Sequence, residues 1–146
     1  MKTKLLVFAL LFSATIASAQ EYAVITTVES IIPAGLGRSR MIANKADLNT
    51  KDFTRERTDG KKSDMNEVKR SDLKIDDFEE TKMLNFYSLT GINFQNIASN
   101  DALVSAKLNE MSQDGWTLAF VTSGVESDAG APDEEGIFIT RYIFKR

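Results

Sequence analysis

The segment Gly35-Leu36-Gly37-Arg38-Ser39-Arg40 carries the residue types best suited to hold an anion. Glycines let backbone N–H groups approach an anion closely, and arginines make paired hydrogen bonds to phosphate, sulfate or carboxylate. The candidate binding residues are Gly35, Gly37, Arg38, Ser39 and Arg40. The segment is not a dinucleotide-binding fingerprint, because no glycine follows Gly37 by three residues and no helix is predicted to begin there. We favour the alternative of a hairpin loop whose arginines pair with the protein's own carboxylates.

A second cluster, of carboxylates, lies near the C-terminus and comprises Glu126, Asp128, Asp133, Glu134 and Glu135. Hard cations such as calcium take oxygen ligands of this kind. The spacing matches no EF-hand loop, however, and Ala131-Pro132 interrupts it. We therefore predict a solvated acidic loop without a metal ion.

Two single residues have types that could bind a ligand. Trp116 is the only tryptophan, and we expect it to cover the edge of the core rather than to form a ligand platform. Arg141 lies within an apolar segment, where a charge must be paired or reach outward to water. We expect Arg141 to form a structural ion pair.

An aromatic and asparagine-rich stretch precedes the predicted helix. It could line a polar groove or supply core residues of two short strands, and we favour the second interpretation. Its members are Asn85, Phe86, Tyr87, Asn93, Phe94 and Asn96.

The chain contains no cysteine and no histidine. Disulfides and thiol chemistry are therefore excluded, and so are the commonest general base and the commonest zinc ligand. Catalysis would have to use carboxylates, lysine, tyrosine or a hard metal ion. The composition thus favours a protein without catalytic activity, and no cofactor is predicted.

The first 19 residues have the pattern of a secretory signal peptide. Lys2 and Lys4 precede an apolar run from Leu5 to Ile16, and Ala17-Ser18-Ala19 supplies the small residues of a cleavage site. A helix of that run would rise about 18 Å, which is short of the roughly 30 Å hydrocarbon core of a membrane. We expect cleavage before Gln20, export to the periplasm or the medium, and no membrane insertion afterwards.

Removal of residues 1–19 leaves 16 basic and 21 acidic residues, a net charge of −5. Nucleic acid is not an expected partner, because phosphate binding needs an excess of Lys and Arg on one face. A binding partner would more naturally be another protein of the envelope or the extracellular space. The sequence favours no particular oligomeric state.

The N-terminal half of the mature chain combines a predicted hairpin with a charged insertion. Residues 22–29 are rich in β-branched types and predict a strand, and residues 38–43 could return beside it. Residues 44–82 carry 21 charges in 39 positions, ten positive and eleven negative. Such a segment buries too little apolar surface to offset its ordering entropy, so we predict a mobile insertion.

The C-terminal half predicts a helix between short strands. Residues 83–97 suggest two short strands around Thr90-Gly91, or an ordered loop rich in asparagine. Ser99 or Asn100 could cap the helix that follows. Val104, Leu108 and Met111 form one apolar stripe, which Gly115 is placed to end.

Two longer strands should follow the helix. In residues 116–123, strict alternation would put Trp116, Leu118 and Phe120 on one face. Residues 137–145 are apolar on both faces, which is typical of an interior strand. We expect this last strand to lie between the first strand and residues 116–123, antiparallel to both.

These elements predict a single α+β domain over residues 20–146. Its sheet should be small and largely antiparallel, with three to five strands, and one helix should pack on one face. The charged insertion of residues 44–82 interrupts it.

Three segments of this pattern resemble the bacterial domain-of-unknown-function family numbered 4177. They are Leu108-Asn109-Glu110 in the helix, Gly115-Trp116-Thr117-Leu118 after it, and Ile143-Phe144-Lys145-Arg146 in the closing strand. The resemblance covers about half of the mature chain and implies a helix followed by a hairpin. It implies no reaction, because the family has no agreed activity.

The sequence thus favours an exported, non-catalytic binding or interaction module. Its contact surface would be a face of the sheet or the loop of residues 35–40. The alternative is a binder of a small anionic ligand at Arg38 and Arg40, and a carboxylate-based hydrolase is the least favoured class.

Overall fold

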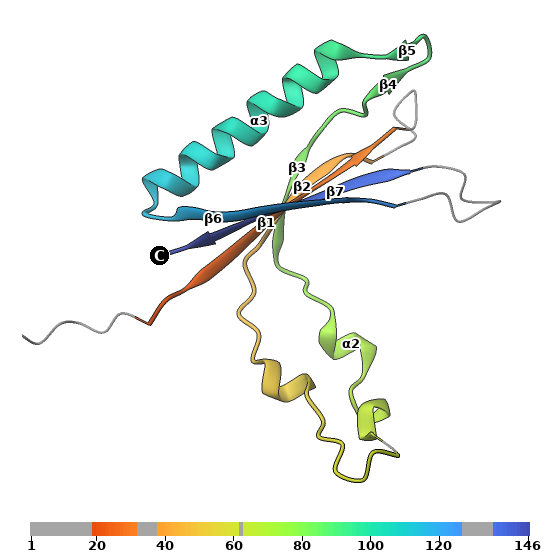
Figure 1. Cartoon of the computed structure of the whole chain (residues 1–146), viewed down its shortest axis with the longest axis vertical. Helices are drawn as coiled ribbons and strands as arrows, with labels where there is room; N and C mark the ends of the chain where they lie inside the picture. The colour runs from red at the N-terminus through yellow and green to blue at the C-terminus, as the bar shows by residue number, and fades with distance from the viewer. Residues whose placement is uncertain (1–18, 32–37, 62, 127–135) are drawn as a thin grey trace, which may run out of the picture.

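A five-stranded antiparallel sheet with one long helix across one face forms the body of the computed structural model (Figure 1). The structure describes residues 19–31, 38–61, 63–126 and 136–146, so the predicted signal peptide lies outside it except for Ala19. The strand order is β3-β2-β1-β7-β6. The strands are β1 (Tyr22–Ser30), β2 (Arg40–Asn44), β3 (Phe78–Lys82), β6 (Thr117–Val125) and β7 (Ile137–Lys145). The predicted α+β class is confirmed.

The topology follows from the apolar pattern of the longest strands. β7 lies between β1 and β6 and is antiparallel to both, as its two apolar faces predicted. β1 and β2 form the expected antiparallel pair, with Ile25 opposite Ala43. The two strands with the most β-branched and aromatic residues, β1 and β7, thus lie in the interior of the sheet together with β2.

Helix α3 (Phe94–Gln113) begins six or seven residues earlier than its sequence pattern predicted. Asn93 is the N-cap, and its Oδ1 accepts hydrogen bonds from the backbone N–H groups of Gln95 and Asn96 at 3.0 and 3.2 Å. The prediction of a cap at Ser99 or Asn100 is therefore wrong, because Asn93 satisfies the free N–H groups of the first turn. The predicted end is confirmed, since Gly115 follows the helix with φ of +85°.

The core lies between α3 and the sheet. Its buried apolar side chains are Ile25, Met41, Met83, Met111 and Phe144. Val104 and Leu108 pack against this cluster, so the predicted apolar stripe of the helix faces the sheet. The opposite face of the sheet has no helix on it among the described residues.

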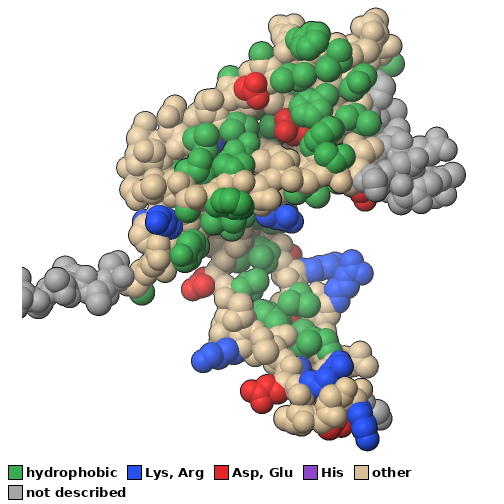
Figure 2. Space-filling model, in the orientation of Figure 1, with side chains coloured by type: hydrophobic (Ala, Val, Ile, Leu, Met, Phe, Trp, Pro, Cys, Tyr) green, Lys and Arg blue, Asp and Glu red, His purple; other side chains and the backbone are tan. Residues whose placement is uncertain are grey.

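The charged insertion forms a projecting arm and one edge strand. The arm contains three short turns, η2 (Thr50–Phe53), η3 (Asp64–Glu67) and α2 (Arg70–Leu73), and it extends away from α3 with charged side chains along it (Figures 1 and 2). The sequence did not predict β3, which closes the insertion and pairs with β2. An edge strand can form from charged residues because backbone hydrogen bonds hold it while its side chains stay in water.

A small separate hairpin precedes α3. β4 (Tyr87–Ser88) and β5 (Gly91–Ile92) make the hairpin predicted around Thr90-Gly91.

Strand β6 contains one bulge. Leu118 lies opposite Phe144 and Phe120 lies opposite Ile143, so Ala119 is an extra, bulged residue. The predicted shared face of Leu118 and Phe120 is therefore wrong, because one inserted residue moves all later side chains to the other face.

Candidate functional site

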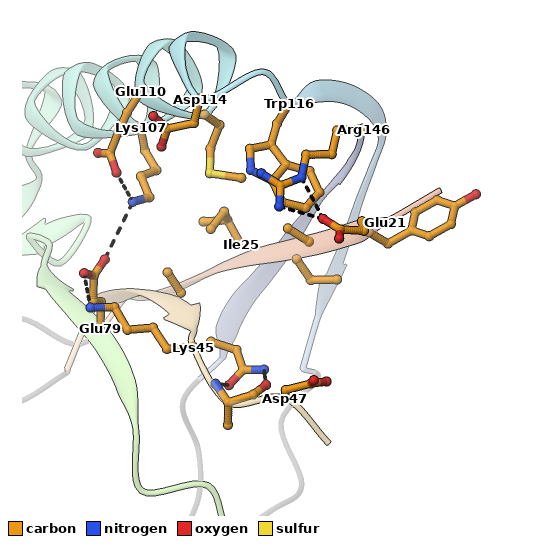
Figure 3. Close-up of a pocket in the computed structure, with 17 residues that line it drawn as sticks. Glu21, Ile25, Lys45, Asp47, Glu79, Lys107, Glu110, Asp114, Trp116 and Arg146 are labelled. Atoms are coloured by element: carbon orange, nitrogen blue, oxygen red, sulfur yellow. Dashed lines mark hydrogen bonds and ion pairs between the residues drawn. The ribbon is translucent and has the colours of Figure 1, made fainter. Parts of the chain in front are cut away.

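A groove of about 830 Å³ opens between the C-terminal end of α3 and the neighbouring ends of β1 and β2 (Figure 3). We call it the Trp116 groove. Apolar side chains form its floor, and these are Ala23, Ile25, Ala43, Met111 and Trp116. Charged side chains from five separate parts of the chain form its walls.

One wall is a chain of ion pairs that links the sheet edge to the helix. Lys45 Nζ lies 2.7 Å from Glu79 Oε1, and Glu79 Oε2 lies 3.7 Å from Lys107 Nζ. Lys107 Nζ also lies 2.6 Å from Glu110 Oε1 one turn along α3. The hydrogen bond from Lys45 is the largest cause of the lowered pKa of Glu79, and the same contact raises the pKa of Lys45. The contact between Lys45 and Glu79 thus favours the charged form of both side chains.

The other wall is built around Trp116. The guanidinium carbon of Arg146 lies 4.3 Å from the centre of the Trp116 ring, a cation–π contact. Arg146 also donates to Glu21 Oε2 from Nε at 2.7 Å, and its Nη2 lies 2.6 Å from the same oxygen. Two backbone hydrogen bonds between Glu21 and Arg146 hold these side chains together, where β1 begins and β7 ends.

The charge of the groove is negative. Five carboxylates line it, from Glu21, Asp47, Glu79, Glu110 and Asp114, against three cations from Lys45, Lys107 and Arg146. Each cation already contacts a carboxylate, whereas Asp47 and Asp114 form no ion pair in the described part of the chain. Asp114 also caps the C-terminus of α3, where the helix dipole itself attracts positive charge.

The structure describes only some of the residues predicted to bind an anion. Gly35 and Gly37 lie outside the described residues, and Arg38 is exposed. Ser39 is 1% exposed, and its Oγ donates to Asn85 Oδ1 at 2.8 Å and accepts from the Ser30 N–H. Ser39 therefore belongs to an internal network and does not face a ligand. Arg40 donates from Nη1 to the carbonyl of Ser39 at 2.8 Å. The anion site at Arg38, Arg40 and the glycines stays a prediction.

Two further sequence predictions concern the acidic cluster near the C-terminus and Arg141. Of the acidic cluster, only Glu126 is described, and Asp128, Asp133, Glu134 and Glu135 lie outside. No group of three or more carboxylates that could hold a metal occurs among the described residues. Arg141 is exposed on the uncovered face of the sheet and forms no ion pair with the described residues, contrary to our expectation.

The asparagines before α3 have structural roles. Asn93 caps the helix, Asn96 donates from Nδ2 to the carbonyl of Asn85 at 2.8 Å, and Asn85 is buried against Ser39. Phe86 packs edge-on against Phe138, with ring centres 5.5 Å apart. Tyr87 and Phe94 are exposed, by 40% and 73% respectively. The two short strands of this stretch are present as β4 and β5, but Tyr87 and Phe94 are not core residues, because both are exposed.

Sequence reasoning missed most of the Trp116 groove. Trp116 packs against the core as predicted, and it also lines the groove. The antiparallel pairing of the first and last strands, which the sequence did predict, is the signal that could have placed Glu21 beside Arg146. No comparable signal connects Lys45, Glu79 and Lys107, which come from three separate segments.

Comparison with known proteins gives no match to a family model, a curated protein or a solved structure. The resemblance to the family numbered 4177 therefore stays a prediction from the residues. None of the helices in the described ranges is long and apolar enough to cross a membrane.

Proposed function

We propose that this protein is an exported, non-catalytic binding module whose Trp116 groove takes a group combining positive charge with an apolar body. A basic segment of another envelope or extracellular protein has this chemistry. The observation that carries the proposal is the unequal pairing of charges in the groove. Its three cations all contact carboxylates, while Asp47 and Asp114 remain without an ion-pair partner among the described residues.

The floor of the groove supports the same class of ligand. Ile25 and Met111 line the groove together with the two carboxylates, and Trp116 already holds a guanidinium over its ring. A cation stacked on tryptophan gains roughly 0.5–1 kcal/mol at an exposed site and more when water is excluded. A lysine or arginine next to an apolar side chain would thus meet a carboxylate and a hydrophobic surface together.

The ion pairing of the carboxylates argues against hydrolysis in this groove. A general acid needs a raised pKa so that it holds its proton near neutral pH. Glu79 has the opposite shift, because Lys45 and Lys107 stabilise its charged form. Glu21 and Glu110 are likewise bound to cations. The carboxylates of the groove are arranged to attract and orient a charge.

Trp116 provides a direct test, because it is the chain's only tryptophan and its fluorescence reports on the groove. The protein is titrated with a synthetic hexapeptide of alternating leucine and lysine, and separately with one of alternating leucine and glutamate. We expect saturable change in Trp116 emission with the first peptide only. That response should weaken as salt is raised, because exposed charges are screened.

A pair of double variants separates the groove from general charge attraction. Asp47→Asn with Asp114→Asn should weaken binding of the lysine peptide at least tenfold. Asp64→Asn with Asp76→Asn removes the same total charge outside the groove and should change the affinity little. Equal loss in both double variants, or equal binding of the two peptides, would show that the groove is not the site. Binding of phosphate that depends on Arg38 would support the alternative anion site.

The exported location is a separate part of the proposal. It rests on Lys2, Lys4, the apolar run and Ala17-Ser18-Ala19. Mass spectrometry of protein from the native envelope or medium should find an N-terminus at Gln20. Recovery of the uncleaved chain beginning at Met1 from the membrane fraction would contradict export by cleavage.

A further inference from the structure

β6 is an edge of the sheet with an unusual amount of exposed apolar surface. All nine of its residues are exposed, and no described strand pairs with its outer side. Four of the nine are large apolar residues, Leu118, Phe120, Val121 and Val125, with exposed fractions from 41% to 62%. An unpaired edge presents a row of free N–H and C=O groups to any strand that can align with it.

The two edges of the sheet differ in how well they are protected. β3 has only five residues and includes Glu79, Glu80 and Lys82, and charges of this kind discourage pairing with another strand. β6 contains no charged residue and no proline. Its one irregularity is the bulge at Ala119, which leaves Phe120 to Val125 in regular register with β7. The regular part of β6 is therefore an open, neutral edge.

We propose that two copies of this chain pair antiparallel along β6 and join their sheets into one of ten strands. The lack of charge on β6 is the first argument that its partner is a second copy, since two identical uncharged strands meet without repulsion. Symmetry is the second, because an antiparallel pair of identical strands has a twofold axis and each copy uses the same surface. Both sheets are antiparallel, so the pattern of pairing continues through the interface.

The side chains of β6 select a register for this pair. Directly opposite residues of an antiparallel pair lie on the same face, so the twofold axis must pass beside one residue and not between two. An axis beside Thr122 places Phe120 opposite Gly124 of the second copy, and the symmetry repeats this contact. Nothing lies within 4 Å of the position where Gly124 would carry a Cβ, so an aromatic ring can cover it.

In the same register, the residues between these two contacts also face compatible partners. Thr122 meets Thr122 of the second copy, and paired threonines are a favourable cross-strand combination. On the face that α3 partly covers, Val121 meets Ser123. Phe120 is 62% exposed in the single chain, so the pairing would remove a large aromatic surface from water at each end of the short ladder.

Sedimentation equilibrium over a range of protein concentrations tests the association. We expect the unaltered protein to form a dimer, and Thr122→Lys to weaken the dimer at least tenfold by placing two charges directly opposite. Thr81→Lys makes the same change on the exposed outer edge of β3 and should leave the dimer intact. An equimolar mixture of Thr122→Lys and Thr122→Glu should restore association, which a merely unfolded variant would not do.

A single thiol tests the register, because the chain has no cysteine of its own. Thr122→Cys should form a covalent dimer on mild oxidation or with a short bifunctional thiol linker, and Thr81→Cys should not. A protein that stays monomeric at its highest soluble concentration would overturn the proposal. So would a dimer that is unaffected by Thr122→Lys and cross-links through Thr81→Cys, which would place the interface at β3.

Discussion

Asn100 of α3 donates a hydrogen bond from Nδ2 to Glu29 Oε1 of β1 at 2.9 Å, across 71 positions of the sequence. The same amide donates to the carbonyl of Leu84 and accepts from the Leu84 N–H, at 2.8 and 2.9 Å. Asn100 is 1% exposed, so these bonds replace contacts with water. They fix the helix both to an interior strand and to the segment that follows β3.

Burial beside Asn100 makes Glu29 a source of pH-dependent stability. Its pKa is raised above the ordinary value of 4.5, mainly by burial, while the bond from Asn100 opposes the rise and the charge of Asp101 adds to it. The folded protein therefore holds this proton more tightly than the unfolded chain. Stability due to Glu29 is greatest at acid pH, falls as the pH passes from 4.5 through the raised pKa, and is constant above it.

Glu29→Gln should remove this part of the pH dependence. Its Oε1 can still accept from Asn100, and no charge is buried, so the variant should be at least as stable as the parent at neutral pH. Urea unfolding between about pH 4 and 7 measures the slope. Glu80→Gln, on exposed β3, is the control and should leave the slope unchanged. Identical profiles for the parent and Glu29→Gln would show that this carboxyl does not contribute.

Adjacent substitutions on α3 should report which face of the helix is buried. Leu108 packs against the core, whereas Asn109 is exposed. Leu108→Ala should lower the free energy of unfolding by about 2 kcal/mol or more, through lost burial and a residual cavity. Asn109→Ala should change it by less than about 0.5 kcal/mol. Chemical denaturation measures both values, and equal losses would be incompatible with this packing.

The end of α3 depends on a glycine conformation. Gly115 has φ of +85°, and the N–H groups of Gly115 and Trp116 donate to the carbonyls of Ser112 and Met111. This is the Schellman arrangement, in which a left-handed residue ends the helix. Gly115→Ala should cost about 1–2 kcal/mol, because a Cβ disfavours this conformation although no neighbour blocks it. Gly115→Asn should cost less in the same thermal unfolding assay, since asparagine tolerates positive φ.

Local sequence patterns predicted those elements whose own residues favour the conformation that they adopt. The β-branched run at the start of β1 indicated a strand, and the two apolar faces of β7 indicated an interior strand. The stripe through Leu108 and the glycine at position 115 indicated the buried face and the end of α3. In each case neighbouring residues alone carry the signal, because strand alternation and helical periodicity are short-range properties.

The sequence by itself determined which segments have to be buried, and only the tertiary structure decided how they align. All five residues of β3 are exposed and three of them are charged, and the segment is a strand because β2 offers it backbone hydrogen bonds. The bulge at Ala119 depends on the register with β7, which no property of residue 119 encodes. The Trp116 groove gathers Lys45, Glu79 and Arg146 from distant segments. These relations arise from pairing and packing between elements, where the free energy depends on partners that are remote along the chain.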